Sequence, residues 1–147
     1  DSERDEKVAA GGFGKYYTDN MVTIDWSEAD GWSDAQLHAY GPITLDPATA
    51  VFHYGQEIFE GMKAYSQPDG SISLFRPDAN ALRFARSAAR LALPELSVEE
   101  FIETINTRCY STILTCDTLI LYLMLLYVDD EYYNSLLRLI KYLVIEN

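Results

Sequence analysis

The amino-acid sequence predicts an α+β domain, in which an antiparallel sheet packs against helices. Residues 21–26 alternate apolar and polar side chains, as a half-buried strand does. An Asp-Gly pair at 69–70 separates two strand-like segments, and this arrangement favours a hairpin. Alanine-rich residues 80–92, which end before Pro94, predict a helix of about four turns. Strands joined by short links and followed by helices are typical of the α+β class.

Length and composition limit the kind of protein. A chain of 147 residues that is 48% hydrophobic can bury one core and does not have the composition of a disordered chain. The net charge of −12 argues against a nucleic-acid partner, because the phosphate backbone is itself anionic. The most apolar run, residues 119–128, is about half as long as a membrane helix. We therefore expect neither nucleic acid nor a membrane as a partner.

Further elements follow in chain order. Residues 1–12 are charged and then rich in alanine and glycine, which predicts a mobile N-terminal arm. A second strand is expected at residues 36–40, before a Gly-Pro turn. Ser97 can cap a second helix while Glu100 bonds back to it, an arrangement known as a capping box. An apolar stripe on that helix is expected to pack on the sheet; its members are Val98, Phe101, Ile102 and Ile105.

The tail, residues 106–147, differs in character from the rest. It is rich in leucine, tyrosine and isoleucine and has no glycine or proline. Residues 119–128 and 140–145 could form two strands or two helices, because the periodicity does not distinguish them. We expect the tail to complete or cover the domain formed by residues 13–105.

The sequence gives no sign of a metal site or a disulfide framework. Cys109 and Cys116 have no second pair, so free thiols in a reducing cytoplasm are expected. His53 has no second histidine at ligand spacing, since the other histidine is His38.

The densest group of chemically active side chains lies in residues 53–65, which hold a histidine, two glutamates, a lysine and several aromatics. On spacing alone, the favoured interpretation is structural: both glycines mark turns, both glutamates face water and the aromatics fill the core. Lys63 could form a Schiff base if desolvated, but a lone lysine on a strand is usually an exposed charge.

Three arginines, Arg83, Arg86 and Arg90, share one face of the first predicted helix. Guanidinium groups are permanently charged donors that suit phosphate. The alternative is a solvated basic face.

Five segments, in this order, resemble bacterial branched-chain amino-acid aminotransferases. They are residues 13–19 with Met21, 40–48, 53–65, 74–77 with Asn80, Ala81 and Arg83, and 87–91 with 94–96. The resemblance covers about residues 13–105. It implies the small, N-terminal domain of a pyridoxal-phosphate enzyme of fold type IV. Such enzymes are usually homodimers and pass an amino group between leucine, isoleucine or valine and 2-oxoglutarate.

The resemblance also implies roles for particular residues. Arg83 matches the arginine that holds the cofactor phosphate. Phe13, Tyr54 and Phe59 match aromatic residues around the pocket for the branched side chain. Tyr122, within the segment Leu-Tyr-Leu, matches a tyrosine that helps to shape the site.

The sequence departs from the family in three places. Asn20 and Ser66 replace a histidine and an arginine, and Met124-Leu125 replaces the Arg-Pro pair after the Leu-Tyr-Leu segment. The large domain, which carries the Schiff-base lysine, has no counterpart, so no catalytic residue is assigned and the chain alone is expected to be inactive. Lys63 matches a different lysine.

Two other interpretations compete with this one. The apolar run at 119–128 would suit a non-catalytic interaction or scaffold domain, in which the tail forms a cover or a dimer face. Transamination of D-amino acids or lyase chemistry on the same fold is disfavoured, because those relatives lack the pattern of residues 53–61.

Overall fold

The computed structural model describes residues 6, 10, 17, 19–113, 118–128 and 136–145, with side chains described up to residue 105 apart from Ser66. Outside this set lie Phe13, Cys116 and the arm expected at residues 1–12, except for residues 6 and 10. The described elements are β1 (Asn20–Ser27), β2 (Gly31–Trp32), β3 (Gln36–Ala39), α2 (Ala50–Tyr54), β4 (Glu57–Ser66), β5 (Ile72–Leu74), α3 (Pro77–Arg90), α4 (Val98–Ile113), β6 (Thr118–Val128) and β7 (Leu136–Ile145).

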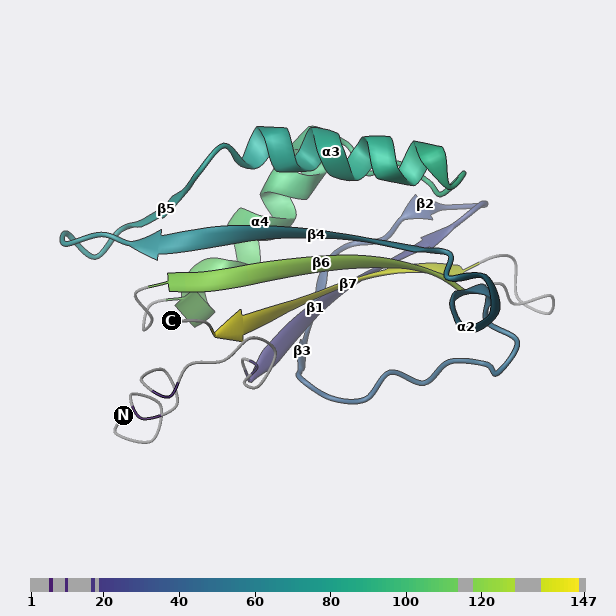
Figure 1. Cartoon of the computed structure of the whole chain (residues 1–147), viewed down its shortest axis with the longest axis horizontal. Helices are drawn as coiled ribbons and strands as arrows, with labels where there is room; N and C mark the ends of the chain where they lie inside the picture. Colours follow the sequence, from purple (N-terminus) through teal and green to yellow (C-terminus); the bar gives the residue numbers. More distant parts are fainter. Residues whose placement is uncertain are drawn as a thin grey trace.

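The strands form one antiparallel sheet (Figure 1). Its order is β2-β1-β7-β6-β4-β5, and β3 also pairs with β1. The predicted α+β class and antiparallel sheet are confirmed. No helix in the described part of the chain is long and apolar enough to cross a membrane.

The hairpin predicted at the Asp-Gly pair joins β4 to β5, with Tyr65 opposite Ser73. Gly70 has φ +80°, a conformation that glycine adopts without steric cost, and its amide donates to the Gln67 carbonyl at 2.9 Å. The Asp69 carboxylate accepts from the Ser71 amide at 2.9 Å and from its hydroxyl at 2.6 Å. Local turn chemistry therefore fixes this end of the sheet.

Helix α3 begins earlier than the alanine-rich run predicted. It starts at Pro77, because proline suits the first helical position, where no amide donor is needed. It ends at Arg90, two residues before the predicted end, and Ala92 then adopts φ +54°. In Figure 1, α3 runs along β4, the strand with which it packs.

The capping box of the second helix is present as predicted. The Ser97 hydroxyl accepts from the Glu100 amide at 3.1 Å, and the Glu100 carboxylate accepts from the Ser97 amide at 3.0 Å. Of the predicted stripe on α4, Phe101 and Ile105 are buried, and Val98 and Ile102 pack against the core.

The core lies between the helices and one face of the sheet. Phe84 of α3 and Phe101 of α4 meet with ring centroids 5.5 Å apart, and each is about 1% exposed or less. Buried side chains from β1 and β4 complete the cluster; they include Ile24, Ile58, Met62 and Ala64.

The tail forms two strands, and so the helical alternative for residues 119–128 and 140–145 is wrong. β6 and β7 lie between β4 and β1. β6 pairs with β4 on one side and β7 on the other, so the apolar run at 119–128 does not form a free sheet edge. β1 and β4 do not pair with each other, and the two tail strands between them join them into one sheet.

Candidate active site

Strand β4 presents two different faces. Ile58, Met62 and Ala64 are buried against the helices, whereas Phe59 and Lys63 are exposed on the other face. This alternation follows from the two-residue period of a strand. Glu60 belongs by the same period to the buried face and is 3% exposed. A carboxylate in this position must find partners, because an unpaired buried charge is costly.

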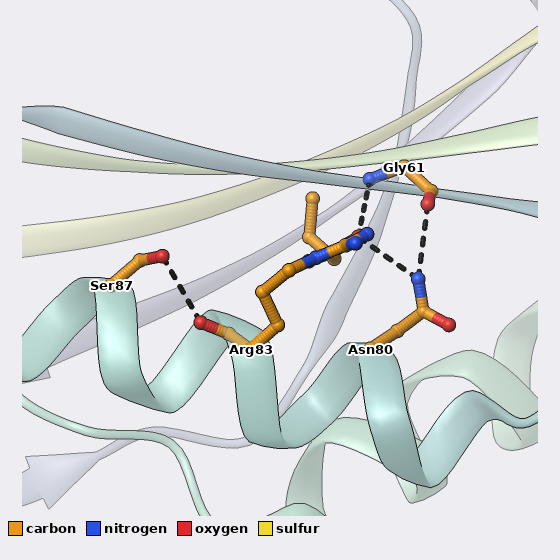
Figure 2. Close-up of polar contacts among 5 residues, drawn as sticks. Gly61, Asn80, Arg83 and Ser87 are labelled. Atoms are coloured by element: carbon orange, nitrogen blue, oxygen red, sulfur yellow. Dashed lines mark hydrogen bonds and ion pairs between the residues drawn. The ribbon is translucent and has the colours of Figure 1, made fainter.

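Helix α3 supplies those partners (Figure 2). Arg83 donates to Glu60 twice, from Nε to Oε2 at 2.7 Å and from Nη2 to Oε1. Asn80, one helical turn earlier, donates from Nδ2 to Glu60 Oε1 at 2.9 Å and to the Gly61 carbonyl at 3.1 Å. The Gly61 amide also donates to Oε1, at 3.1 Å. The carboxylate is therefore satisfied on both oxygens.

The guanidinium of Arg83 remains accessible although one edge of it is bound. Its side chain is 61% exposed, against 2% for that of Glu60. Hydrogen bonding to Glu60, and then its negative charge, raise the pKa of Arg83 above its ordinary value. Arg83 therefore stays cationic and offers its unbound N–H groups to solvent.

A shallow pocket of about 320 Å³ lies beside this ion pair. It is lined by Ile58, Arg83, Arg86, Ser87, Arg90 and Leu91. All three arginines that the sequence placed on one helix face border it. The Ser87 hydroxyl donates a hydrogen bond to the Arg83 carbonyl within α3, at 3.0 Å. In a chain of net charge −12, this pocket concentrates cationic groups and suits an anion.

Two of the aromatic residues expected to bind substrate, Tyr54 and Phe59, lie near or on β4 and are largely exposed. Tyr54, the last residue of α2, is 84% exposed, and Phe59 on β4 is 72% exposed. Gly55 ends α2 with φ +58°, which turns the chain from Tyr54 into β4. Tyr122 pairs with Gly61 in the β4–β6 ladder, two positions from Phe59; its side chain, like the whole of Phe13, lies outside the described set.

The structural interpretation of residues 53–65 is wrong at three points. Glu60 is buried rather than facing water, Gly61 lies within β4 rather than at a turn, and Tyr54 and Phe59 do not fill the core. Glu57 and Lys63 are exposed, as that interpretation expected.

Sequence reasoning missed Glu60 and Asn80. A signal for Glu60 was available, because it alternates with Ile58, Met62 and Ala64, and a carboxylate in an apolar row calls for a cation. Asn80 and Arg83, three residues apart on one helix face, were the complementary signal. No cluster of three or more potential metal ligands occurs among the described residues.

Curated relatives match most of this chain but a small part of their own length. A probable branched-chain-amino-acid aminotransferase of Streptomyces coelicolor is 58% identical over 103 residues, 70% of this chain and 28% of the relative. Branched-chain-amino-acid transaminase 1 of Bacillus subtilis is 48% identical over 95 residues, 65% of this chain and 27% of the relative. No protein-family model matches the chain.

Solved structures share the fold at low sequence identity. A branched-chain amino acid aminotransferase from Thermobaculum terrenum, solved in its PLP form, superposes with a TM-score of 0.63 at 13% identity, covering 86% of this chain and 40% of that one. A fold IV transaminase from Curtobacterium pusillum superposes with a TM-score of 0.58 at 16% identity. The match covers 87% of this chain and 43% of that one.

The fold of the chain matches solved structures in the class of fold type IV aminotransferases, and 70% of the chain matches a curated aminotransferase in sequence. Within that class, its sequence relatives are the branched-chain amino-acid aminotransferases, and it spans somewhat more than a quarter of their length.

Proposed function

We propose that this chain supplies the phosphate-binding arginine and part of the substrate wall of a branched-chain amino-acid aminotransferase dependent on pyridoxal phosphate. The observation that carries the proposal is Arg83, whose guanidinium is held by Glu60 yet is 61% exposed beside an arginine-lined pocket. Arg83 also occupies the position that the family resemblance gives to the phosphate-binding residue.

The described residues fit the phosphate end of such a cofactor. Guanidinium donors in a fork geometry match phosphate oxygens, and a pocket of about 320 Å³ can admit a phosphate group. When bound, pyridoxal phosphate supplies the carbonyl group that takes up the amino group of the substrate. The part of Arg83 is to bind the phosphate and so orient that carbonyl.

The substrate wall is the second part of the proposal. Tyr54 and Phe59 present exposed aromatic surface near the start of β4, and such surface suits the branched side chains of leucine, isoleucine and valine. Phe13 and Tyr122 are assigned to the same wall by resemblance. By resemblance, we also propose 2-oxoglutarate as the partner substrate and a cytoplasmic homodimer as the form of the enzyme.

No Schiff-base lysine is assigned in this chain. Lys63 lies on the outer face of β4, whereas Glu60 lies on the inner face and contacts Arg83 of α3 there. Residues 13–105 are proposed as the small domain, which residues 106–147 complete. The chain spans 28% of the Streptomyces coelicolor relative, and the rest of the site is proposed to come from a large domain. We expect no amino transfer from leucine to 2-oxoglutarate by this chain alone, measured as glutamate formed.

Equilibrium dialysis with pyridoxamine 5′-phosphate tests the phosphate assignment. This probe carries no aldehyde and so cannot form an imine with any lysine. We expect Arg83→Ala to weaken binding about tenfold or more, because a charge-assisted bidentate contact is lost.

Two controls accompany the dialysis. Lys63→Ala removes one positive charge from the opposite face of β4 and is expected to bind as the wild type does. Pyridoxamine without phosphate should be insensitive to Arg83→Ala. Equal binding of the phosphorylated probe by wild type and Arg83→Ala would refute the proposal.

A further inference from the structure

We propose that Glu60 is a positioning residue that aims the Arg83 guanidinium at an anion, and that Asn80 holds Glu60 in place for this task. The inference rests on the proposed function of Arg83 and assigns roles to two residues that the resemblance leaves without one.

The number and direction of the Arg83 donors support this role. A guanidinium has five N–H donors in one rigid plane. Glu60 occupies Nε and one N–H of Nη2. Because the group is planar, binding one edge fixes the direction of the other edge, and the side chain is 61% exposed. The remaining donors are therefore held in one direction as a pre-oriented set on a residue that borders the pocket.

Glu60 is itself held from two elements. Its Oε1 accepts from the Gly61 amide of its own strand and from Asn80 Nδ2 of α3. Asn80 also donates to the Gly61 carbonyl, so α3 is tied to β4 beside the carboxylate (Figure 2). A carboxylate that is 3% exposed and bonded on both oxygens cannot follow a moving arginine. The arginine must instead take the direction that Glu60 gives it.

The other two pocket arginines show what this arrangement adds. Arg86 and Arg90 border the same pocket and are exposed. Within the described part of the chain, neither makes a side-chain hydrogen bond or ion pair. They contribute charge, but their side chains keep their rotamer freedom and lose it on binding. Arg83 has already lost most of that freedom in the folded chain, so an anion binds it at a lower entropic cost.

Glu60 acts on an anion in two opposite ways. Whether Glu60→Gln weakens or strengthens anion binding therefore shows which of the two is larger. Its negative charge repels an anion at Arg83, whereas its hydrogen bonds orient the donors. Glu60→Gln removes the repulsion. It also replaces one acceptor oxygen with an amide N–H₂. Since Oε1 accepts three bonds, the amide group is expected at the Oε2 position, where it faces Arg83 Nε as a second donor.

Sulfate is the probe, because its charge is constant over the working pH range, and binding to the whole chain is followed by NMR titration. We expect Glu60→Gln to weaken sulfate binding about tenfold, although it removes a negative charge. Arg83→Ala should weaken binding at least as much. In the Arg83→Ala background, Glu60→Gln should no longer weaken binding, because the residue it positions is gone and only the relief of repulsion remains.

The outcomes separate the two claims. If Arg83→Ala weakens binding but Glu60→Gln binds as tightly as wild type or more so, the positioning role is overturned and the proposed function stands. If the wild type shows no saturable binding, or Arg83→Ala binds equally well, the proposed function and this inference both fail.

Asn80→Ser supplies a second test that does not change charge. It removes the hydrogen bond that the Asn80 side-chain amide donates to Glu60, and we expect it to weaken sulfate binding about two- to threefold. Far-UV circular dichroism of each variant checks that it is folded. If Glu60→Gln does not fold, Asn80→Ser replaces it as the test of the positioning role. Wild-type affinity in a folded Asn80→Ser variant would remove Asn80 from the proposal.

Discussion

The two faces of β4 differ in what they do for the protein. The inner face packs Ile58, Met62 and Ala64 against α3 and α4, and its single charged residue, Glu60, is fully paired. The outer face exposes charged and aromatic side chains, among them Phe59 at 72%. Burial alone therefore does not separate fold from function in our proposal, because the buried Glu60 is proposed to position the arginine that we assign to phosphate.

The largest expected contrast is between a core and a surface phenylalanine. Phe101→Ala removes a fully buried ring that packs on Phe84, and the free energy of unfolding should fall by about 3–5 kcal/mol. Phe59→Ala removes an exposed ring from the outer face, and the change should stay within about 0.5 kcal/mol. Urea unfolding followed by tryptophan fluorescence measures both. Equal losses would show that the outer face is part of the core.

The two glutamates of β4 give the next contrast. Glu60→Ala leaves the Asn80 amide and the Gly61 N–H without their acceptor, and should cost about 1–3 kcal/mol. Glu57→Ala, on the exposed face, should change stability by about 0.5 kcal/mol or less. Thermal unfolding of both variants decides the point. A smaller loss for Glu60→Ala than for Glu57→Ala would mean that Glu60 is not satisfied by these partners.

The start of α4 offers a smaller effect, away from β4. Ser97→Ala removes the hydroxyl that accepts from the Glu100 amide and should cost about 1 kcal/mol. The midpoint of urea unfolding should fall without a change in slope, because the surface exposed on unfolding is unchanged. A midpoint equal to that of wild type would show that the capping box does not stabilise the helix.

The smallest effect concerns acid and the exposed hairpin. Hydrogen bonds from the Ser71 hydroxyl and then its amide lower the pKa of Asp69 below its ordinary value of 3.8. A lowered folded-state pKa contributes stability above 3.8 that is lost as the pH falls through the folded value. Ser71→Ala should move the pKa of Asp69 up, as followed by NMR of its carboxyl carbon. An unchanged titration would show that the hydroxyl bond does not form.

Local patterns predicted much of the fold. The Asp-Gly hairpin and the Ser97–Glu100 box are each specified by residues a few positions apart, and both were found. The sequence predicts too late a start for α3, because its alanine content favours a helix from residue 80 whereas Pro77 suits the first helical position. The strands of the tail could not be told from helices, because leucine-rich runs satisfy both periods and their pairing partners lie far away in the sequence.

The site was predictable only in part, for a similar reason. Arg83 was found from helix spacing and resemblance, and the structure then placed it beside a pocket. Glu60 was missed because its partner lies 23 residues away on another element, and a glutamate taken alone is expected in water. The roles of Phe13 and Tyr122 stay predictions.

The position of β7 has a consequence for the order of events during folding. It pairs Val22 of β1 with Lys141, so residues far apart in the sequence become neighbours in the centre of the sheet. Contacts of such long sequence separation slow folding, because much loop entropy is lost before they form. On a ribosome, β1 would remain separate from the β4–β6 pair until β7 had emerged, and its edge would need protection until then.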